Sequence, residues 1–469
     1  MDTSTDLYRA VDQAVDSYAP LIEGLANELW ELAEVSLHEV ESEKAVIGAL
    51  EELGFTITSR RTAGVATAFI AEWGSGGPKV GLLAEYDALP GLGNAAVPYQ
   101  APRADGKTSG HGCGHNLFGA AIVGAAGALK SLLAKKQLPG TIRVYGCAAE
   151  EAEGAKTYMA REGLFNDLDA ALHWHPGDNS MVMNMRLLAL NQVRVEFFGR
   201  TAHAGAAPWL GRSAAHAAEL FIHGLNLMRE HVQPTARIHY TLNRAGEAPN
   251  VVPDYAQLTV IVRDSERSRV EEMTDWLKQI AEGAALATQT TSKTLVFTGA
   301  YDLLPNTPLA QRMQQHLEQV GAPHFTDEEY AFAIELQRNA GLPTTGFDTS
   351  VSPLPSDSMV IGASSDVGDV SYLTPTMGCG LPTVPRGVQM HTWAATASHG
   401  TSIGVKGAIH AAKVLARVGL DVLSDAELRS SARADFERRT ANVTYRSPLP
   451  DDLRRPLGTP AHLLEAEHD

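Results

Sequence analysis

The sequence is poor in cysteine, in positive charge and in long apolar runs, and each shortage excludes a class of protein. Three cysteines in 469 residues are too few for a disulfide framework, so we expect a reducing, cytoplasmic environment. The formal net charge of −17 argues against nucleic acid or an anionic membrane as a partner. No uncharged apolar run reaches the roughly 18 residues of a membrane span, and the polar first residues predict no signal peptide.

Short β-rich runs alternate with helical runs in the first part of the chain, which is typical of an α/β fold. Apolar residues recur at three- and four-residue steps over 6–34, which predicts one amphipathic helix. Polar clusters follow several of the predicted strands, at the edge where open α/β sheets bind ligands. We therefore predict a mixed, largely parallel sheet. Its strands fall at 65–73, 79–83, 141–149 and 170–174.

The α/β pattern of the sequence stops near residue 188, and near residue 302 the chain returns to the first domain. Between them, the predicted order strand, helix, strand, strand, helix, strand is that of a ferredoxin-like α+β unit. The last residues, 431–469, are charged and contain proline, which predicts a helix followed by a surface tail.

A glycine-rich turn over 109–116 carries a thiol and imidazoles at the start of an apolar helix. Cys113 and His115 are two residues apart and can reach one metal ion from a tight turn. The helix N-terminus favours a nearby thiolate. Taken alone, the turn also fits a glycine-rich loop with a chance cysteine. His111 precedes the pair and is more typical of a pocket residue than of a ligand.

Three further clusters supply nitrogen and oxygen ligand atoms. With the Cys113 turn, they predict a site for one or two divalent transition ions, such as zinc, manganese, cobalt or nickel. Two-metal hydrolytic sites use a bridging water as the nucleophile. The clusters are Glu150-Glu151, His173-Trp174-His175, and His391 with Asp366 nearby.

Adjacent carboxylates often belong only to a solvated loop, but a metallohydrolase needs one carboxylate as a ligand and another as a base. We assign Glu150 as the general base and Glu151 as a ligand. His173 and His175 face the same side of an extended strand. We favour His173 as the ligand and leave His175 in the pocket.

The second domain contributes two polar candidates. His203 lies among small residues and is either structural or an oxyanion donor. Asn250 is either a turn residue or a contact to a substrate amide. A partner for a substrate carboxylate is not identified from the sequence, and the candidates are Arg200, Arg212 and Arg263.

Several segments, in this order along the chain, resemble the aminoacylase/carboxypeptidase family of metallopeptidases, in its amidohydrolase branch. The resemblance implies a discontinuous catalytic domain of residues 1–188 and 302–430, with a dimerising lid of residues 189–301 between them. The matching segments are Ala84–Gly91, Gly110–Gly119, Ala148–Gly154, Leu172–Pro176, Arg200–Gly205, Asp366–Thr376, His391–Trp393 and Gly404–Gly407.

The resemblance also implies roles for single residues. Asp87 would orient a ligand imidazole, Glu150 would be the base, and His203 would reach across a dimer to stabilise the oxyanion. Asn116 departs from the family pattern, where aspartate is common. The segment before His391 is unmatched, so His399 is its substitute. The implied metal ligands are Cys113, His115, Glu151, His173 and His391.

We therefore expect a metal-dependent amidohydrolase, with zinc or manganese, that forms a homodimer or a larger oligomer. It would cleave the amide between an acyl or aroyl group and an amino acid, as in p-aminobenzoyl-glutamate or a dipeptide. One alternative is a subunit that is inactive without a related partner chain. A second is a cysteine hydrolase with Cys113 as nucleophile and His115 or His173 as base, although Cys113 and His115 are too close in sequence for the usual geometry. A third is a non-catalytic metal-binding protein, which would have no use for the spare carboxylate of Glu150.

Overall fold

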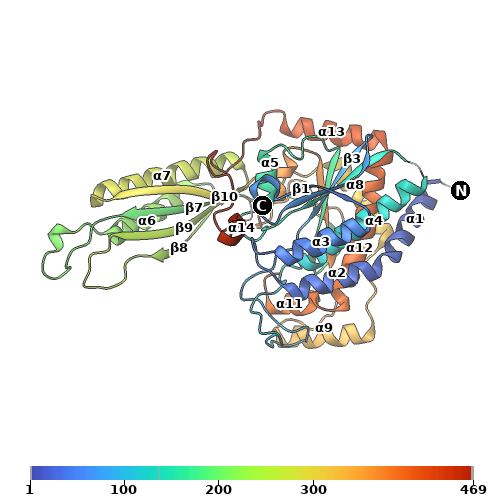
Figure 1. Ribbon diagram of the computed structural model, residues 1–469, viewed down its shortest axis with the longest axis horizontal. Helices are drawn as coiled ribbons and strands as arrows, with labels where there is room; N and C mark the ends of the chain where they lie inside the picture. Colours follow the sequence, from blue (N-terminus) through green and yellow to red (C-terminus); the bar gives the residue numbers. More distant parts are fainter. Residues whose placement is uncertain (1–2, 137, 466–469) are drawn as a thin grey trace.

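The computed structural model describes residues 3–136 and 138–465 and shows a larger and a smaller domain side by side (Figure 1). A seven-stranded sheet organises the larger domain and a four-stranded sheet the smaller one. Each sheet has its own hydrophobic core, and the core of the smaller domain draws on residues between Ala189 and Val296. The predicted α/β class with an additional α+β unit is confirmed.

The seven-stranded sheet has the strand order β1-β2-β4-β3-β5-β11-β6. Its four central strands are parallel, and the outer pairings are antiparallel. The central strands therefore end at one shared edge, where their following loops meet. The strands are β1 (Thr56–Arg60), β2 (Phe69–Ser75), β3 (Lys79–Ala84), β4 (Gly140–Gly146), β5 (Ala170–Gly177), β6 (Met181–Val182) and β11 (Thr376–Pro382).

Helices cover this sheet, and α4 is the central one, packed against α1, α2 and α12 (Figure 1). By length and composition α4 resembles a membrane span, but 83% of its most apolar window is buried inside the protein. It is therefore a core helix. The helices are α1 (Thr3–Ser17), α2 (Ala19–Leu32), α3 (Val40–Glu52), η1 (Thr62–Gly64), α4 (His115–Lys136), α5 (Ala155–Arg161), α8 (Thr307–Val320), α9 (Asp327–Asn339), α10 (Val367–Ser371), α11 (Trp393–His399), α12 (Ser402–Ser424), α13 (Ala426–Thr440) and α14 (Ala461–Glu465).

Two predictions in the first 75 residues were wrong. The single helix expected over 6–34 is two helices that meet at Tyr18, because Pro20 occupies the first turn of α2. Proline lacks the N–H that a continuous helix needs. The strand expected from residue 65 begins only at Phe69, after the short helix η1.

The smaller domain, which we call the lid, has the element order and the strand order β10-β7-β9-β8 of a ferredoxin-like unit. Val193, Val195 and Phe197 of β7 are buried, on the face where α6 and α7 pack. Alternate residues of β7 therefore lie on the opposite, open face. The elements are β7 (Ala189–Phe198), η2 (Pro208–Leu210), α6 (Ala214–Met228), η3 (Arg229–His231), β8 (Arg237–Arg244), β9 (Tyr255–Asp264), α7 (Arg267–Thr288) and β10 (Thr291–Ala300).

The segment after α13 is not the surface tail that we expected. Leu449 and Leu453 are buried in the core of the larger domain. The backbone N–H groups of Leu457 and Gly458 donate to the buried carboxylate of Glu153. Apolar side chains and a buried acceptor thus hold this segment at the junction with the lid, where α14 lies (Figure 1).

Candidate active site

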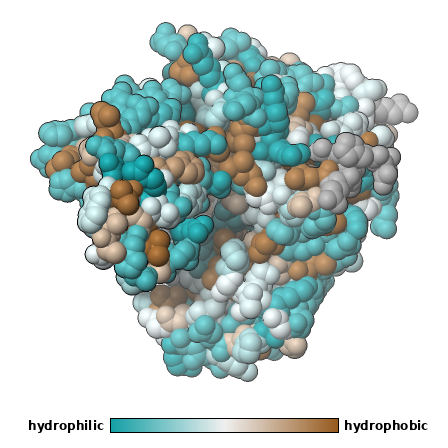
Figure 2. Space-filling view, turned by 60° about the vertical axis from the view of Figure 1, so that its left-hand side comes forward, coloured by the Kyte–Doolittle hydropathy of each residue, from teal (hydrophilic) through white to brown (hydrophobic). Residues whose placement is uncertain are grey.

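A cavity of about 720 Å³ lies where the strand edge of the larger domain faces the lid. Figure 2 shows a hollow on this face of the molecule, bordered in part by apolar side chains. The lid contributes a patch from the open face of its sheet, because Leu190 pairs with Arg263 and Gln192 pairs with Ile261 on neighbouring strands. Volumes of this size are typical of small-molecule sites.

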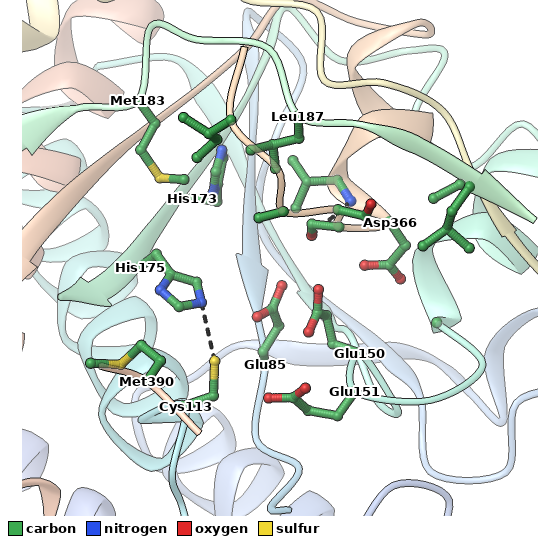
Figure 3. Close-up of a pocket in the computed structure, with 18 of the residues that line it drawn as sticks. Glu85, Cys113, Glu150, Glu151, His173, His175, Met183, Leu187, Asp366 and Met390 are labelled. Carbon is green, nitrogen blue, oxygen red and sulfur yellow. Dashed lines mark hydrogen bonds between the residues drawn. The ribbon is translucent and has the colours of Figure 1, made fainter. Parts of the chain in front are cut away.

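Cys113 and His175 meet at one side of this cavity (Figure 3). Cys113 Sγ lies 3.4 Å from His175 Nε2. His175 Nδ1 donates to the carbonyl oxygen of Pro176 at 2.7 Å, which leaves its Nε2 lone pair free to bind. Burial raises the pKa of the Cys113 thiol and lowers the pKa of His175 to about 4.

The N-terminus of α4 positions His115. The preceding Gly114 has a φ of +78°, and a Cβ there would lie 2.7 Å from Pro176, so only glycine fits the turn. His115 Nδ1 donates to Asp87 Oδ1 at 2.9 Å, which directs Nε2 into the site. Burial disfavours an ionised Asp87, but the hydrogen bond and charge of His115, together with the hydrogen bonds from Glu151 N–H and Ser36, outweigh burial and lower the pKa of Asp87 to about 2.

Glu151 and His391 form a second pair, with His391 Nε2 3.2 Å from Glu151 Oε1. The backbone N–H of Glu151 donates to Asp87, so one carboxylate fixes both His115 and the Glu151 loop. His391 has a φ of 63°, an uncommon conformation for a residue with a side chain and one that recurs at functional sites.

Carboxylates gather on the other side of the cavity, where Figure 3 shows Glu85, Glu150 and Asp366. Glu85 Oε2 lies 3.3 Å and Glu150 Oε2 3.9 Å from His115 Nε2. Burial raises the pKa of Glu150, and the charges of Glu85 and Glu151 raise it further. The fully buried Lys156 lies between Glu85 and Asp366, at 2.8 Å and 2.6 Å.

These side chains make three groups whose ligand atoms lie within 4.8 Å of one another, and two of the groups share Cys113. His115 Nε2 is buried without a hydrogen-bond partner among the described residues. Thiol, imidazole and carboxylate donors suit divalent transition metals. The residues present therefore fit one or two such ions. The groups are Cys113-His115-His175, Cys113-Glu151-His391 and Glu85-His115-Glu150.

The structure places the other predicted histidines away from these groups. His173 lines the cavity, but its ring packs against Gly378, and it belongs to none of the three groups. This geometry favours His175 over His173 as the ligand. His111 is bonded at both nitrogens, to Leu29 and Asn116.

His399, the substitute for His391, is also saturated, because its nitrogens contact Thr383 and the carbonyl of His111. A ring with both nitrogens occupied has no lone pair to offer a metal. The geometry thus favours His391 over His399.

His203 and Asn250 are exposed on the lid and do not line the cavity. His203 Nδ1 accepts from the backbone N–H groups of Gly205 and Ala206. Arg200 and Arg212 also lie outside the cavity. Only Arg263 of the three candidate arginines lines it.

Sequence reasoning missed the roles of Glu85 and Lys156. In the sequence, Glu85 was recognised only as one of the acidic residues that follow β3, and not as a neighbour of His115. Nothing in the local sequence distinguishes Lys156 from a surface lysine. It also missed Met181, Met183 and Met185, which line the cavity. Their spacing of two residues was the available signal, because alternate residues of a strand share one side.

Comparison with known proteins agrees with this geometry. Residues 81–332 match the model of peptidase family M20/M25/M40. The chain is 36% identical to the B subunit of p-aminobenzoyl-glutamate hydrolase from Escherichia coli (strain K12), over 96% of this chain and 98% of that protein. It is 27% identical to Xaa-Arg dipeptidase of Mus musculus, over 92% of each chain.

A solved structure shares the fold. It is a Bacillus subtilis protein described as a dinuclear metal binding peptidase from the M20 family, with a TM-score of 0.55 and 19% identity. The alignment covers 85% of this chain and 99% of that chain. Together with the family match and the first relative, these findings show that the chain belongs to peptidase family M20/M25/M40 and is a metal-dependent amidohydrolase.

Proposed function

We propose that this chain hydrolyses the amide bond of an N-acyl or N-aroyl amino acid or a dipeptide, with two metal ions and Glu150 as the general base. The observation that carries the proposal is the pair of ligand groups that share Cys113, with the carboxylate of Glu150 beside them. The E. coli relative is named for p-aminobenzoyl-glutamate and the mouse relative for a dipeptide, which supports this substrate class.

In this proposal His115, His175, Glu151 and His391 hold the ions, and Cys113 lies between the two groups. When bound, two such ions would activate a water molecule and polarise the substrate carbonyl. Zinc or manganese suits the mixed sulfur, nitrogen and oxygen donors. The name of the B. subtilis structure, which specifies two metals, supports the count.

Glu150 moves the proton. Its raised pKa makes it a stronger base than an ordinary glutamate, so it takes a proton from the attacking water. It then donates that proton to the leaving nitrogen. Asp87 keeps His115 in the tautomer that presents Nε2 to the site.

Arg263 is the proposed partner of the substrate carboxylate. It reaches the cavity from β9 of the lid, and its Nε is buried without a hydrogen-bond partner among the described residues. Among the residues that the structure describes, Arg263 forms no ion pair, and its Nη1 donates to Ser364 Oγ at 3.5 Å. Burial lowers the pKa of its guanidinium. An unpaired, partly buried cation of this kind favours an anionic ligand.

We also propose the domain boundaries given above, a cytoplasmic location and a homodimer. The three buried cysteines are unpaired, which suits a reducing compartment. In the dimer, His203 and Asn250 would approach the partner's active site from the lid. Because the E. coli relative is named as one subunit of a hydrolase, a related second subunit is the alternative partner.

Replacement of Glu150 by glutamine tests the chemistry. We expect kcat to fall by roughly 10²- to 10⁴-fold, the usual contribution of a general base, with metal content unchanged. Glu41→Gln, on the exposed face of α3, is the matched control and should behave as the parent. Loss of metal together with activity would instead make Glu150 a ligand. Activity that survives thorough chelation would refute the proposed function.

A further inference from the structure

One wall of the cavity is built from methionine. Four of the chain's 11 methionines line it, with Leu187 and Ile361 beside them. Figure 3 shows Met183 and Met390 on either side of His175, opposite the carboxylates. The four are Met181, Met183, Met185 and Met390. We call these six residues the methionine wall.

The backbone holds most of this wall in place. Residues 181–187 begin as β6 and bend at Met185, and along them Met183 N–H donates to the carbonyl of Gly378 of β11 and Arg186 N–H to the carbonyl of Met359. The residues between the methionines turn away from the cavity, since Val182 is buried in the core and Asn184 donates to Pro355. The three methionines therefore reach the cavity from one fixed segment.

The methionine wall carries no charge. The charged side chains that line the cavity are Glu85, Glu150, Glu151, Asp366 and Arg263, and none belongs to the wall. A charged acyl group placed there would lose its hydration without a partner. An uncharged ring would gain burial and sulfur–aromatic contacts, which thioethers make favourably.

We propose that the methionine wall is the subsite for an uncharged aromatic ring on the acyl side of the substrate. This inference rests on the proposed function. The scissile amide then lies beside Cys113 and Glu150, and the amino acid part faces the polar side with Arg263. The wall thus selects aroyl over short or anionic acyl groups.

The test compares three glutamate amides that differ only in the acyl group: benzoyl, acetyl and succinyl. For the metal-loaded protein, kcat/KM for benzoyl-glutamate should exceed that for acetyl-glutamate roughly 10- to 100-fold, the gain from burying a side chain the size of phenylalanine. Succinyl-glutamate should be the poorest of the three. An acetyl or succinyl preference would overturn the proposal.

Variants locate the selectivity. Met183→Ala together with Met390→Ala should lower the benzoyl-to-acetyl ratio by roughly tenfold, while Met183→Leu retains most of it. Met359→Ala is the control, because Met359 is 47% exposed and does not line the cavity. An equal loss for both substrates would show that the methionines only support the fold, and would overturn the proposal.

A binding measurement separates this inference from the proposed function. Calorimetric titration of the Glu150→Gln protein should give a dissociation constant for benzoyl-glutamate at least tenfold below that for acetyl-glutamate. If no amide is cleaved by the parent but this binding preference is present, the proposed function fails and the aromatic subsite stands. Equal binding of both amides would overturn the subsite even if the parent is an active hydrolase.

Discussion

Lys156 offers a quantitative test of the buried charges beside the active site. Its side chain is fully buried and pairs with Glu85 and Asp366 at 2.8 Å and 2.6 Å. Burial alone would lower the pKa of Lys156, but these two carboxylates outweigh it and raise the pKa. Lys156→Met keeps most of the aliphatic volume and removes only the charge. Removing one partner of a buried ion pair destabilises by about 3–5 kcal/mol, so we expect a loss of that size at pH 7.

The assay is urea denaturation followed by tryptophan fluorescence, since Trp174 is fully buried in the same domain. Lys44→Met is the matched control. Its ion pair with Glu41 is as short, at 2.6 Å, but both side chains are more than half exposed, so the unfolding midpoint should not move. A loss below about 1 kcal/mol for Lys156→Met would refute the reasoning, because it would mean that the pairs contribute little in this setting.

The pH dependence adds a second check on the same variant. Burial already raises the pKa of Glu85, so without Lys156 its carboxyl would bind a proton in the folded state at a higher pH than in the unfolded chain. The folded variant then holds more protons than the unfolded chain near neutral pH. Its stability deficit should therefore shrink as the pH falls from 7 toward 5. Adding Glu85→Gln should also recover part of the loss, because it removes one unpaired charge.

Two further predictions concern the positions of the histidines. Asp87→Asn should weaken metal binding roughly 10- to 100-fold, because it removes the carboxylate that orients His115. Competition with a chromogenic chelator measures this. Asp451→Asn, at an exposed position outside the cavity, is the control, and unchanged affinity would contradict the role. Gly378→Ala should destabilise by about 1–3 kcal/mol, because a Cβ there would lie 2.4 Å from the His173 ring. Gly362→Ala, which meets only open space, should not change the urea midpoint, and equal midpoints for the two variants would show that the ring moves aside freely.

Local sequence patterns were sufficient to predict most of the fold. The order of strands and helices in the lid followed from alternation and helical periodicity, and the alternation is clearest in β7 and β9, which bury every second residue. The break at Tyr18 was missed because Pro20 is equally compatible with a kink or with a fresh helix start. The burial of Leu449 and Leu453 was missed because prolines flank the first and charged residues the second, and only tertiary contact shows where two isolated leucines pack.

The site was predictable in outline but not in its choice between His173 and His175. Both histidines face the same side of β5, so the local pattern cannot separate them. The structure separates them by depth, since His173 packs over Gly378 while His175, nearer the end of β5, reaches Cys113. Lys156 could not be predicted for a related reason. Its burial is explained only by its ion pairs with Glu85 and Asp366, which are distant from it in the sequence and adjacent to it only in the fold.

The way in which the lid joins the catalytic domain has a consequence for how the chain is assembled. The chain enters the lid along β7 and leaves along β10, and these strands pair directly, with Leu190 opposite Ala300. Entry and exit thus lie about one strand spacing apart, roughly 5 Å, although more than a hundred residues intervene. The lid is an inserted cassette whose removal leaves two ends that a tight turn can join. The larger domain without the lid would keep Cys113, Glu150 and the methionine wall. It would lose Arg263, and with it the group that the cavity offers to a substrate carboxylate.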